Sequence, residues 1–213
     1  VVERTKIKSI ILFYNSGNIE DYFETSGSTI TSYSGYFETL TIPEKINGVT
    51  IKSLEPYVFK GTELVSVTFP SSIVSVGGYV FENCQNLKYV NAPGVTKLFI
   101  AAFNNCQNIK FVKGSSPLAS DTEGVFLPSL AETAKLAFAN CSGLKTVNLP
   151  KLTTTSYALF YNCTSLEECS IPNATLLEKD MFSNCSKLTS FFIGSNVETI
   201  NSPFYGSGLK KLT

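Results

Sequence analysis

Apolar residues recur along the chain at a fixed spacing, and phenylalanine marks the period most clearly. The marker residues are Phe59, Phe81, Phe103, Phe138, Phe160, Phe182 and Phe204, and neighbours in this series lie 22 residues apart except for one interval of 35. A constant period of this length is the sequence signature of proteins that stack one small structural unit per repeat. The pattern therefore predicts a solenoid, in which each coil buries its apolar side against its neighbours.

A second pattern inside each repeat predicts a short β-strand. Apolar residues occupy the first, fourth and sixth positions of a stretch that begins six residues after the phenylalanine, as in Leu144, Val147 and Leu149. The last two alternate with polar residues, as in a strand with one buried face, and a proline such as Pro150 usually follows because it has no N–H to donate. The rest of each repeat is long enough to return the chain, so successive strands are expected to pair in parallel.

Cysteine occupies one position of the repeat, three residues after the phenylalanine and directly after an asparagine. The copies are Cys84, Cys106, Cys141, Cys163 and Cys185. We expect each thiol to pack on the inner wall as a small apolar group, and each asparagine to lie in a turn where its amide bonds the backbone of neighbouring turns. Disulfides between coils are the alternative, although stacked side chains run parallel instead of converging. A zinc site is disfavoured because no two cysteines have C-x-x-C spacing.

The strand alternation also predicts two columns of outward-facing residues. They read Ser66, Tyr89, Phe111, Thr146, Glu168, Ser190 and Lys211, and Thr68, Asn91, Lys113, Asn148, Ser170, Phe192 and Thr213. Neighbouring exposed aromatics are candidate interface anchors, although single apolar residues are common on surfaces. The candidate ligand-binding residues are Tyr89, Phe111, Asn91, Lys113 and Phe192, and the candidate structural residues are Phe81, Phe103, Phe138, Phe160, Phe182 and the five repeated cysteines. Lys88, Lys110 and Lys145, which recur just before the strands, are interpreted as a solvated edge.

Residues 1–38 depart from the repeat and are predicted to form an N-terminal cap, a strand plus a hairpin, with the repeat array at 39–213. Ile7, Ile10 and Leu12 echo the strand pattern without the phenylalanine and cysteine that precede it elsewhere. The stretch "YFETSGSTIT" predicts a hairpin that turns at Ser26–Gly27 and covers the open end of the solenoid.

Two further departures lie inside the array. The interval of 35 holds 13 extra residues, which we place at about 114–125, "GSSPLASDTEGV"; they form either a solvated loop or a binding loop. At the other end, "FYGSGLKKLT" begins another rung and stops after Leu212. We expect either a continuation of the natural chain or a partner over the exposed strand edge, including end-to-end self-association at this rung.

Composition and charge exclude several functions. The chain has 213 residues, 43% of them hydrophobic, and equal numbers of basic and acidic residues without a basic run, which disfavours nucleic acid and anionic membranes as partners. No apolar run is long enough for a membrane span, and the start does not resemble a signal peptide. The absence of histidine removes the commonest general base and metal ligand, and no phosphate-binding loop occurs. We expect no catalytic residues, no cofactor and no metal, and therefore no enzyme.

The repeat resembles the BspA-like class of leucine-rich repeats, which reads roughly C-x-x-L-x-x-I-x-L-P, then I/L-x-x-I, then A-F-x-x-C. Six units from Leu64 to Leu209 match it, and residues 27–59 look like the first unit of such an array. The resemblance implies a right-handed leucine-rich-repeat solenoid with one parallel β-sheet face and short helical or 3-10 return segments. It also implies a secreted or cell-surface protein of a host-associated organism, with a role in adhesion. The expected function is a recognition module for a protein or glycan; the alternative is a structural spacer or stalk of a larger surface protein.

Overall fold

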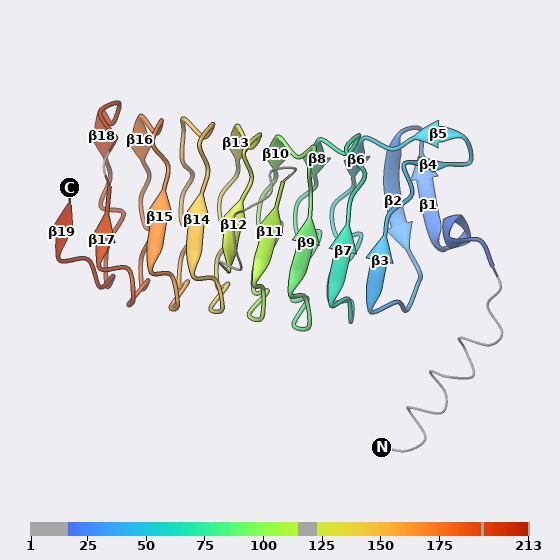
Figure 1. Ribbon diagram of the computed structural model, residues 1–213, viewed down its shortest axis with the longest axis horizontal. Helices are drawn as coiled ribbons and strands as arrows, with labels where there is room; N and C mark the ends of the chain where they lie inside the picture. Colours follow the sequence, from blue (N-terminus) through green and yellow to red (C-terminus); the bar gives the residue numbers. More distant parts are fainter. Residues whose placement is uncertain (1–16, 115–122, 193, 213) are drawn as a thin grey trace, which may run out of the picture.

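The computed structural model describes residues 17–114, 123–192 and 194–212. Its coils stack in single file along one axis, so that segments one repeat apart in the sequence lie side by side (Figure 1). A parallel sheet runs along the stack, with one short strand from each coil. This is the arrangement that the periodic pattern predicts.

The larger sheet, which we call the main sheet, has seven parallel strands. Their order is β15-β14-β12-β11-β9-β7-β3, with bounds β3 (Thr39–Thr41), β7 (Ser66–Thr68), β9 (Tyr89–Asn91), β11 (Phe111–Lys113), β12 (Gly124–Phe126), β14 (Thr146–Asn148) and β15 (Glu168–Ser170). In a typical strand the middle residue, such as Val90 or Val147, is buried and its two neighbours face outward. After β15, the strands β17 (Ser190–Phe191) and β19 (Lys211–Leu212) form a separate parallel pair.

A second ladder of very short strands runs along another side of the coils, at the upper edge in Figure 1. It has the order β1-β2-β6-β8-β10-β13, with bounds β1 (Phe23–Ser26), β2 (Thr29–Tyr33), β6 (Ser53–Leu54), β8 (Ser75–Val76), β10 (Lys97–Leu98) and β13 (Glu132–Thr133). Further along, β16 (Leu176–Leu177) pairs with β18 (Thr199–Ile200), and a small hairpin joins β4 (Lys45–Ile46) to β5 (Val49–Thr50). The expectation of a single sheet face is thus corrected, because the coils are paired on two sides.

The return segments consist of turns, so the expectation of helical or 3-10 return segments is wrong. In the coil around Phe81, Tyr79 has a left-handed φ of 59°, which interrupts any helix. Backbone N–H groups alternate in their partners: that of Cys84 donates to the carbonyl of Phe81 at 3.1 Å, whereas that of Phe81 donates to Ala102 of the next coil at 2.8 Å. Within the described residues the one helix is the 3-10 helix η1 (Ile19–Tyr22), which precedes the first strand.

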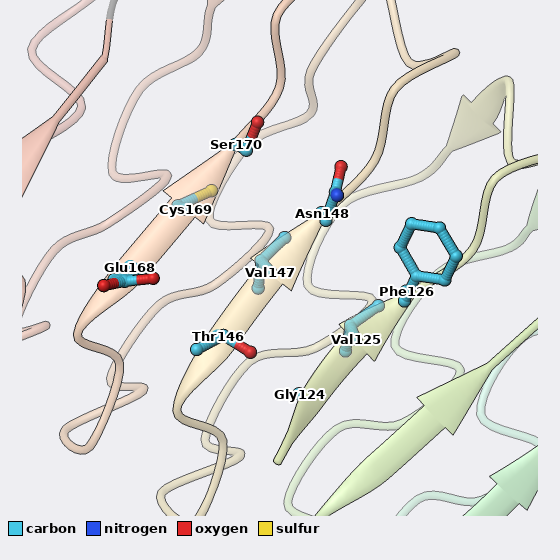
Figure 2. A pocket seen from close by; sticks show the side chains of 9 residues that line it. All are labelled: Gly124, Val125, Phe126, Thr146, Val147, Asn148, Glu168, Cys169 and Ser170. Carbon is cyan, nitrogen blue, oxygen red and sulfur yellow. The ribbon is translucent and has the colours of Figure 1, made fainter. Parts of the chain in front are cut away.

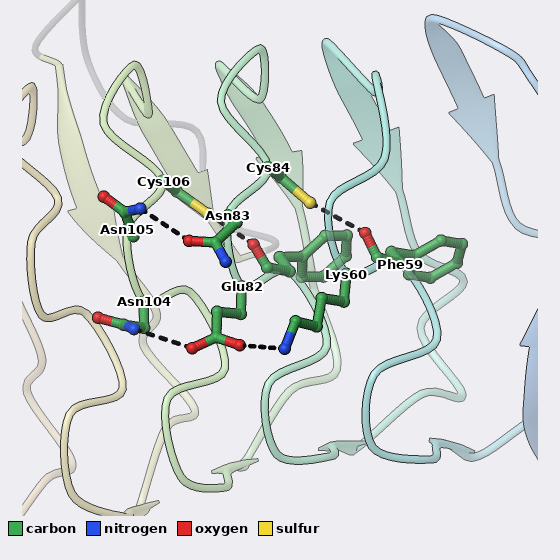
Figure 3. Close-up of polar contacts among 9 residues, drawn as sticks. Phe59, Lys60, Glu82, Asn83, Cys84, Asn104, Asn105 and Cys106 are labelled. Atoms are coloured by element: carbon green, nitrogen blue, oxygen red, sulfur yellow. Dashed lines mark hydrogen bonds and ion pairs between the residues drawn. The ribbon is translucent and has the colours of Figure 1, made fainter.

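The asparagine of each Asn-Cys pair lies in a turn, as expected, and has a left-handed backbone. The five residues, with φ from 58° to 63°, are Asn83, Asn105, Asn140, Asn162 and Asn184. Asparagine adopts this conformation at lower cost than most residues. Its amide bonds a side chain of the neighbouring coil instead of the expected backbone: Asn105 Nδ2 donates to Asn83 Oδ1 at 2.7 Å (Figure 3), and Asn162 Nδ2 donates to Asn140 Oδ1 at 3.0 Å.

The core is a stack of phenylalanine rings that runs from coil to coil. From Phe59 to Phe204, successive repeat phenylalanines have ring centroids 5.2–5.8 Å apart and planes within 12° of parallel. All of these rings are buried except that of Phe204, which is half-buried. Because each interior ring is covered on both faces, its removal leaves a cavity that the neighbouring coils cannot close.

The five repeated cysteines lie beside this stack as buried thiols, and Cys169 is also free and buried. Each repeated thiol donates a hydrogen bond to the carbonyl of the phenylalanine one coil earlier, with Sγ···O distances of 3.0–3.2 Å, as between Cys84 and Phe59 in Figure 3. Burial raises the pKa of Cys141 and of Cys185 to about 12. The thiols are therefore neutral, and they act both as small apolar groups and as donors that link adjacent coils.

The N-terminal end of the ring stack is covered by a hairpin of β1 and β2. Ser26 pairs with Thr29, so the turn residues are Gly27, with φ 56°, and Ser28, one position later than the sequence pattern predicts. The ring of Tyr33 packs edge-on against Phe59, with centroids 5.0 Å apart, and burial raises the pKa of its hydroxyl to about 12. The predicted strand with Ile7, Ile10 and Leu12 lies outside the described residues, and the boundary at residue 38 stays a prediction.

Candidate functional site

The outer face of the main sheet carries two columns of side chains. The first column is Thr39, Ser66, Tyr89, Phe111, Gly124, Thr146 and Glu168, and the second is Thr41, Thr68, Asn91, Lys113, Phe126, Asn148 and Ser170. These columns match the sequence-based ones from Ser66 to Ser170 and add the rungs of β3 and β12. The residues predicted to follow, such as Ser190 and Lys211, lie on β17 and β19, outside the main sheet. Strand pairing sets neighbours in each column one rung apart, which is about 4.8 Å.

Tyr89 and Phe111 form an aromatic pair at the centre of this face. Their ring centroids lie 5.5 Å apart with planes 14° from parallel, and 42% of Tyr89 is exposed. The ammonium of Lys113 lies 4.3 Å from the centroid of Phe111. Because Tyr89 covers one face of the Phe111 ring, this ammonium covers the other, and Phe111 presents its edge to solvent. Asn91, paired in register with Lys113, is exposed beside them.

Phe192 is the one candidate that the structure leaves apart from this group. It is 60% exposed and directly follows β17, which is not hydrogen-bonded to β15. Three strands, β12, β14 and β15, lie between it and the aromatic pair. The structure therefore brings together Tyr89, Phe111, Asn91 and Lys113, but not Phe192.

Strand β12 is the part of the site that the sequence-based interpretation missed. The predicted insertion at 114–125 includes Gly124 and Val125, the first two residues of this strand, and its residues 115–122 lie outside the described part. The signal was nevertheless present, because Val125-Phe126-Leu127-Pro128 repeats the apolar-x-apolar-Pro ending of other units, such as Val147-Asn148-Leu149-Pro150. The extra residues thus add a rung to the main sheet, and reading them as a loop alone is incomplete.

Glycine is required at the first position of β12. A Cβ on Gly124 would lie 2.0 Å from Thr146 Oγ1 and 2.5 Å from the Thr146 carbonyl oxygen, closer than side chains tolerate. Because glycine, threonine and serine are small, the face sinks into a depression of about 300 Å³ over β12, β14 and β15. Figure 2 shows Phe126 on one side of this depression and Glu168 on the other, with Thr146, Asn148 and Ser170 along it.

The added rung also changes the charges beside the sheet. Glu123 precedes β12 as Lys110 precedes β11 and Lys145 precedes β14, so the carboxylate lies between two ammonium groups, at 2.8 Å and 2.7 Å. Hydrogen bonds from Lys110 and then from Lys145 lower the pKa of Glu123 to about 2. Two of the three lysines interpreted as a solvated edge are therefore ion-paired, while Lys88 is exposed.

Nothing in the described coils assembles a metal-binding set. Among these residues, no three histidine, cysteine, aspartate or glutamate side chains gather as metal ligands. No helix in the described ranges is long and apolar enough to cross a membrane. The geometry offers a contact surface: exposed ring edges, an ammonium group, amides and a depression with an acidic rim.

The fold and this face define a solenoid of the leucine-rich-repeat class. The family model described as "BspA type Leucine rich repeat region", with six copies, matches residues 25–133 and 122–213. The chain therefore belongs to the BspA-type leucine-rich repeat family, and both the resemblance drawn from the repeat and the predicted solenoid class are confirmed. Its members provide a repeat scaffold of a kind that is typically non-catalytic.

Solved structures agree with this assignment. The T. pallidum leucine-rich repeat protein is 21% identical, with a TM-score of 0.74, and the match covers 85% of this chain and 84% of that one. A leucine-rich cell surface protein from Faecalibacterium prausnitzii is 25% identical, with a TM-score of 0.74 over 90% of this chain, which spans only 54% of that protein. A leucine-rich repeat protein from Eubacterium ventriosum is 20% identical, with a TM-score of 0.55, over 82% and 60% of the two chains. No curated protein matches the chain.

Proposed function

We propose that this chain is a non-catalytic recognition module of a secreted or cell-surface protein, and that it binds a protein or glycan through the outer face of the main sheet. The observation that carries the proposal is the Tyr89–Phe111 pair, two stacked aromatic side chains on adjacent strands of a rigid sheet, with Tyr89 exposed and Phe111 half-buried. Aromatic side chains at such positions offer a large contact area and lose little conformational entropy on binding.

Three features around the pair support a binding role. The ammonium of Lys113 is held 4.3 Å from the Phe111 centroid, so a charged group is already positioned before a partner arrives. Asn91 adds an exposed amide on the neighbouring rung. Both strands are paired on each side, β9 with β7 and β11 with β12, which keeps the surface in one shape. Pre-organised groups of this kind reduce the cost of association.

The proposed location and the absence of catalysis have separate support. The F. prausnitzii neighbour is described as a cell surface protein, and it shares a quarter of its aligned residues with this chain. Histidine is absent from the whole sequence, so Ser–His and Cys–His pairs lack their base, and burial raises the pKa of the repeated cysteines, which disfavours the reactive thiolate. These observations favour a binding function on the scaffold of its family.

The test replaces Tyr89 and Phe111 together by serine and measures binding to a panel of purified extracellular proteins and to a glycan array. We expect the double variant to weaken binding of any ligand found by about 30-fold or more, which corresponds to about 2 kcal/mol, with little change in melting temperature. The matched control is Tyr57→Ser with Tyr79→Ser. This second stacked pair, with centroids 5.1 Å apart, lies on the return segments instead of the sheet face.

A spacer function predicts a different outcome. If this array only holds another domain at a distance, replacing it with an unrelated solenoid of equal length preserves the binding of the full protein. If binding is lost with that replacement and with the Tyr89/Phe111 variant, but not with the control pair, recognition by the sheet face is supported. Unaltered affinity of the Tyr89/Phe111 variant would contradict the proposal.

A further inference from the structure

We infer that the depression over β12, β14 and β15 binds an arginine side chain of a partner protein. This inference rests on the proposed recognition function, and it extends the site from the aromatic pair to the neighbouring part of the same face. The depression is lined on its outer side by Gly124, Phe126, Thr146, Asn148, Glu168 and Ser170. It owes its existence to the added rung, because Gly124 has no side chain to fill the first column next to Phe111.

The charge of the depression is set by Glu168. This carboxylate is exposed on the rim and has no hydrogen bond or ion pair with any described side chain. Two of the basic groups nearby, Lys110 and Lys145, bind Glu123, and the Lys113 ammonium lies over the Phe111 ring, next to the β12 end of the depression. The opposite end, at β15, therefore presents the unpaired negative charge of Glu168, which complements a cation.

The opposite rim favours a guanidinium over a simple ammonium. Phe126 is half-buried and stands across the depression from Glu168 in Figure 2, so that a ring and a carboxylate flank the same space. A planar guanidinium stacks on aromatic rings and bonds a carboxylate through two N–H groups at once, which an ammonium cannot do. Thr146 and Asn148 between the rims supply oxygen atoms that can accept its remaining donors.

The aromatic pair argues for a protein partner over a glycan at this place. A sugar ring packs on an open aromatic face, but the Phe111 ring has Tyr89 on one face and the Lys113 ammonium on the other, so the pair offers one open face, that of Tyr89 toward Ser66. The exposed ring edges instead suit apolar side chains. Phe111 and Glu168 lie three rungs apart, roughly 14 Å along the stack, a distance that about four residues of extended chain can bridge. One partner segment can therefore reach both.

The test is a 15N NMR titration of the whole chain with the peptide acetyl-Gly-Gly-Arg-Gly-Gly-amide. The comparison peptide has citrulline in place of arginine, which keeps the shape and removes the charge. We expect the arginine peptide to shift the backbone amide signals of Gly124, Asn148 and Ser170, and the citrulline peptide to leave them in place. The Glu168→Gln variant should weaken arginine-peptide binding by about threefold or more, as expected for one solvent-accessible charge pair.

Glu167→Gln is the matched control, because Glu167 is equally acidic and exposed but does not line the depression. It should change the affinity by less than about twofold. The NMR spectrum also reports whether each variant is folded. The inference is overturned if the arginine and citrulline peptides act alike, if Glu168→Gln has no effect, or if no signal moves at about 10 mM peptide, where binding of millimolar affinity is visible. It is equally overturned if cellopentaose, a neutral oligosaccharide, shifts these signals and the arginine peptide does not.

Failure of this inference can be separated from failure of the proposed function. If a partner from the binding panel depends on Tyr89 and Phe111 but binds Glu168→Gln normally, the sheet face is a recognition surface and the arginine site is wrong. If the partner depends on neither, both assignments fail together.

Discussion

The extra residues between Phe103 and Phe138 affect the main sheet but not the return side of the stack. On the return side the packing is the same as between any other pair of coils. The ring centroids of Phe103 and Phe138 lie 5.2 Å apart, and the N–H of Phe103 donates to the carbonyl of Ala137 at 2.8 Å. On the main sheet, β12 separates β11 from β14 (Figure 1). The same residues thus leave the ring stack unchanged and add a strand, with the buried Val125, to the main sheet.

This difference shows where a repeat protein can vary without loss of its core. The rings, thiols and asparagines of each coil contact the next coil, and these contacts are kept across the 35-residue interval. The main sheet accepts another strand because parallel pairing uses the backbone, which every sequence provides. The added rung then supplies Gly124, Phe126 and Glu123, which together form the depression and the ion-paired lysines.

The largest effect is expected in the core. Phe160→Ala should lower the free energy of unfolding by about 3–5 kcal/mol, because Phe160 is covered on both faces by Phe138 and Phe182. Phe204→Ala should cost clearly less, since Phe204 is half-buried. Denaturant unfolding measures both, and equal losses would contradict the stacked-ring core.

A smaller loss of stability is expected on the face, at the added rung. Gly124→Ala should cost about 1–3 kcal/mol, because the new Cβ has to displace Thr146. Adding Thr146→Ala should restore only part of this loss, since the carbonyl oxygen of Thr146 also lies within 2.5 Å of the Cβ position. Wild-type stability of Gly124→Ala in the same unfolding assay would show that β12 does not lie against β14.

Thiol reactivity should differ between the core and the floor of the depression. All six cysteines should titrate as free thiols after unfolding. In the folded protein Cys169 should react first, because it lines the depression and is 7% exposed, whereas the five repeated cysteines are 0% exposed. Mass spectrometry after brief exposure to a thiol reagent identifies the order. Native disulfides, or modification of a repeated cysteine before Cys169, would contradict the packing described above.

The smallest effect concerns the ion-paired carboxylate beside β12. The pKa of Glu123 is about 2 in the folded protein, below its ordinary value of 4.5, so its stabilising contribution is complete above the ordinary value and is lost as the pH falls toward the folded one. The stability difference between the wild type and Glu123→Gln should therefore shrink between about pH 5 and pH 2. Glu132→Gln, which removes the more exposed pair with Lys97, is the control. A difference that stays constant over this window would mean that the carboxylate is not bound by the two lysines.

The period in the sequence was enough to predict the coils, the inward rings and thiols, and the outward columns. The rings and thiols follow from an apolar residue that recurs at one position of each repeat, as with Phe160 and Cys163, and the outward columns are the residues that alternate with inward ones. The left-handed asparagines, such as Asn83, were placed in turns but not assigned their conformation, because φ is set by the bonds that the turn makes with its neighbours. The partner of each thiol, a carbonyl one coil away, likewise depends on the stacking distance.

Other features escaped prediction for physical reasons that are specific to short elements. Strands of two residues, such as Ser75–Val76 and Lys97–Leu98, are too short to show alternation, so the second ladder left no pattern. The strand β12 has the Val-x-Leu-Pro ending but lacks the phenylalanine and cysteine before it, since the ring stack passes directly from Phe103 to Phe138. The depression, which depends on the neighbours of Gly124, could not be predicted without that strand.

The measurement that tests the central claim most directly is the set of NMR contacts between strands of the main sheet. The central claim is that β12 lies between β11 and β14, with Val125 opposite Val112 on one side and opposite Val147 on the other. We predict nuclear Overhauser contacts between the backbones of Val112 and Val125 and between those of Val125 and Val147, and none between Val112 and Val147. Direct backbone contacts between Val112 and Val147, with none to Val125, would contradict the added rung and remove the depression, the ion-paired Glu123 and the arginine site that depend on it.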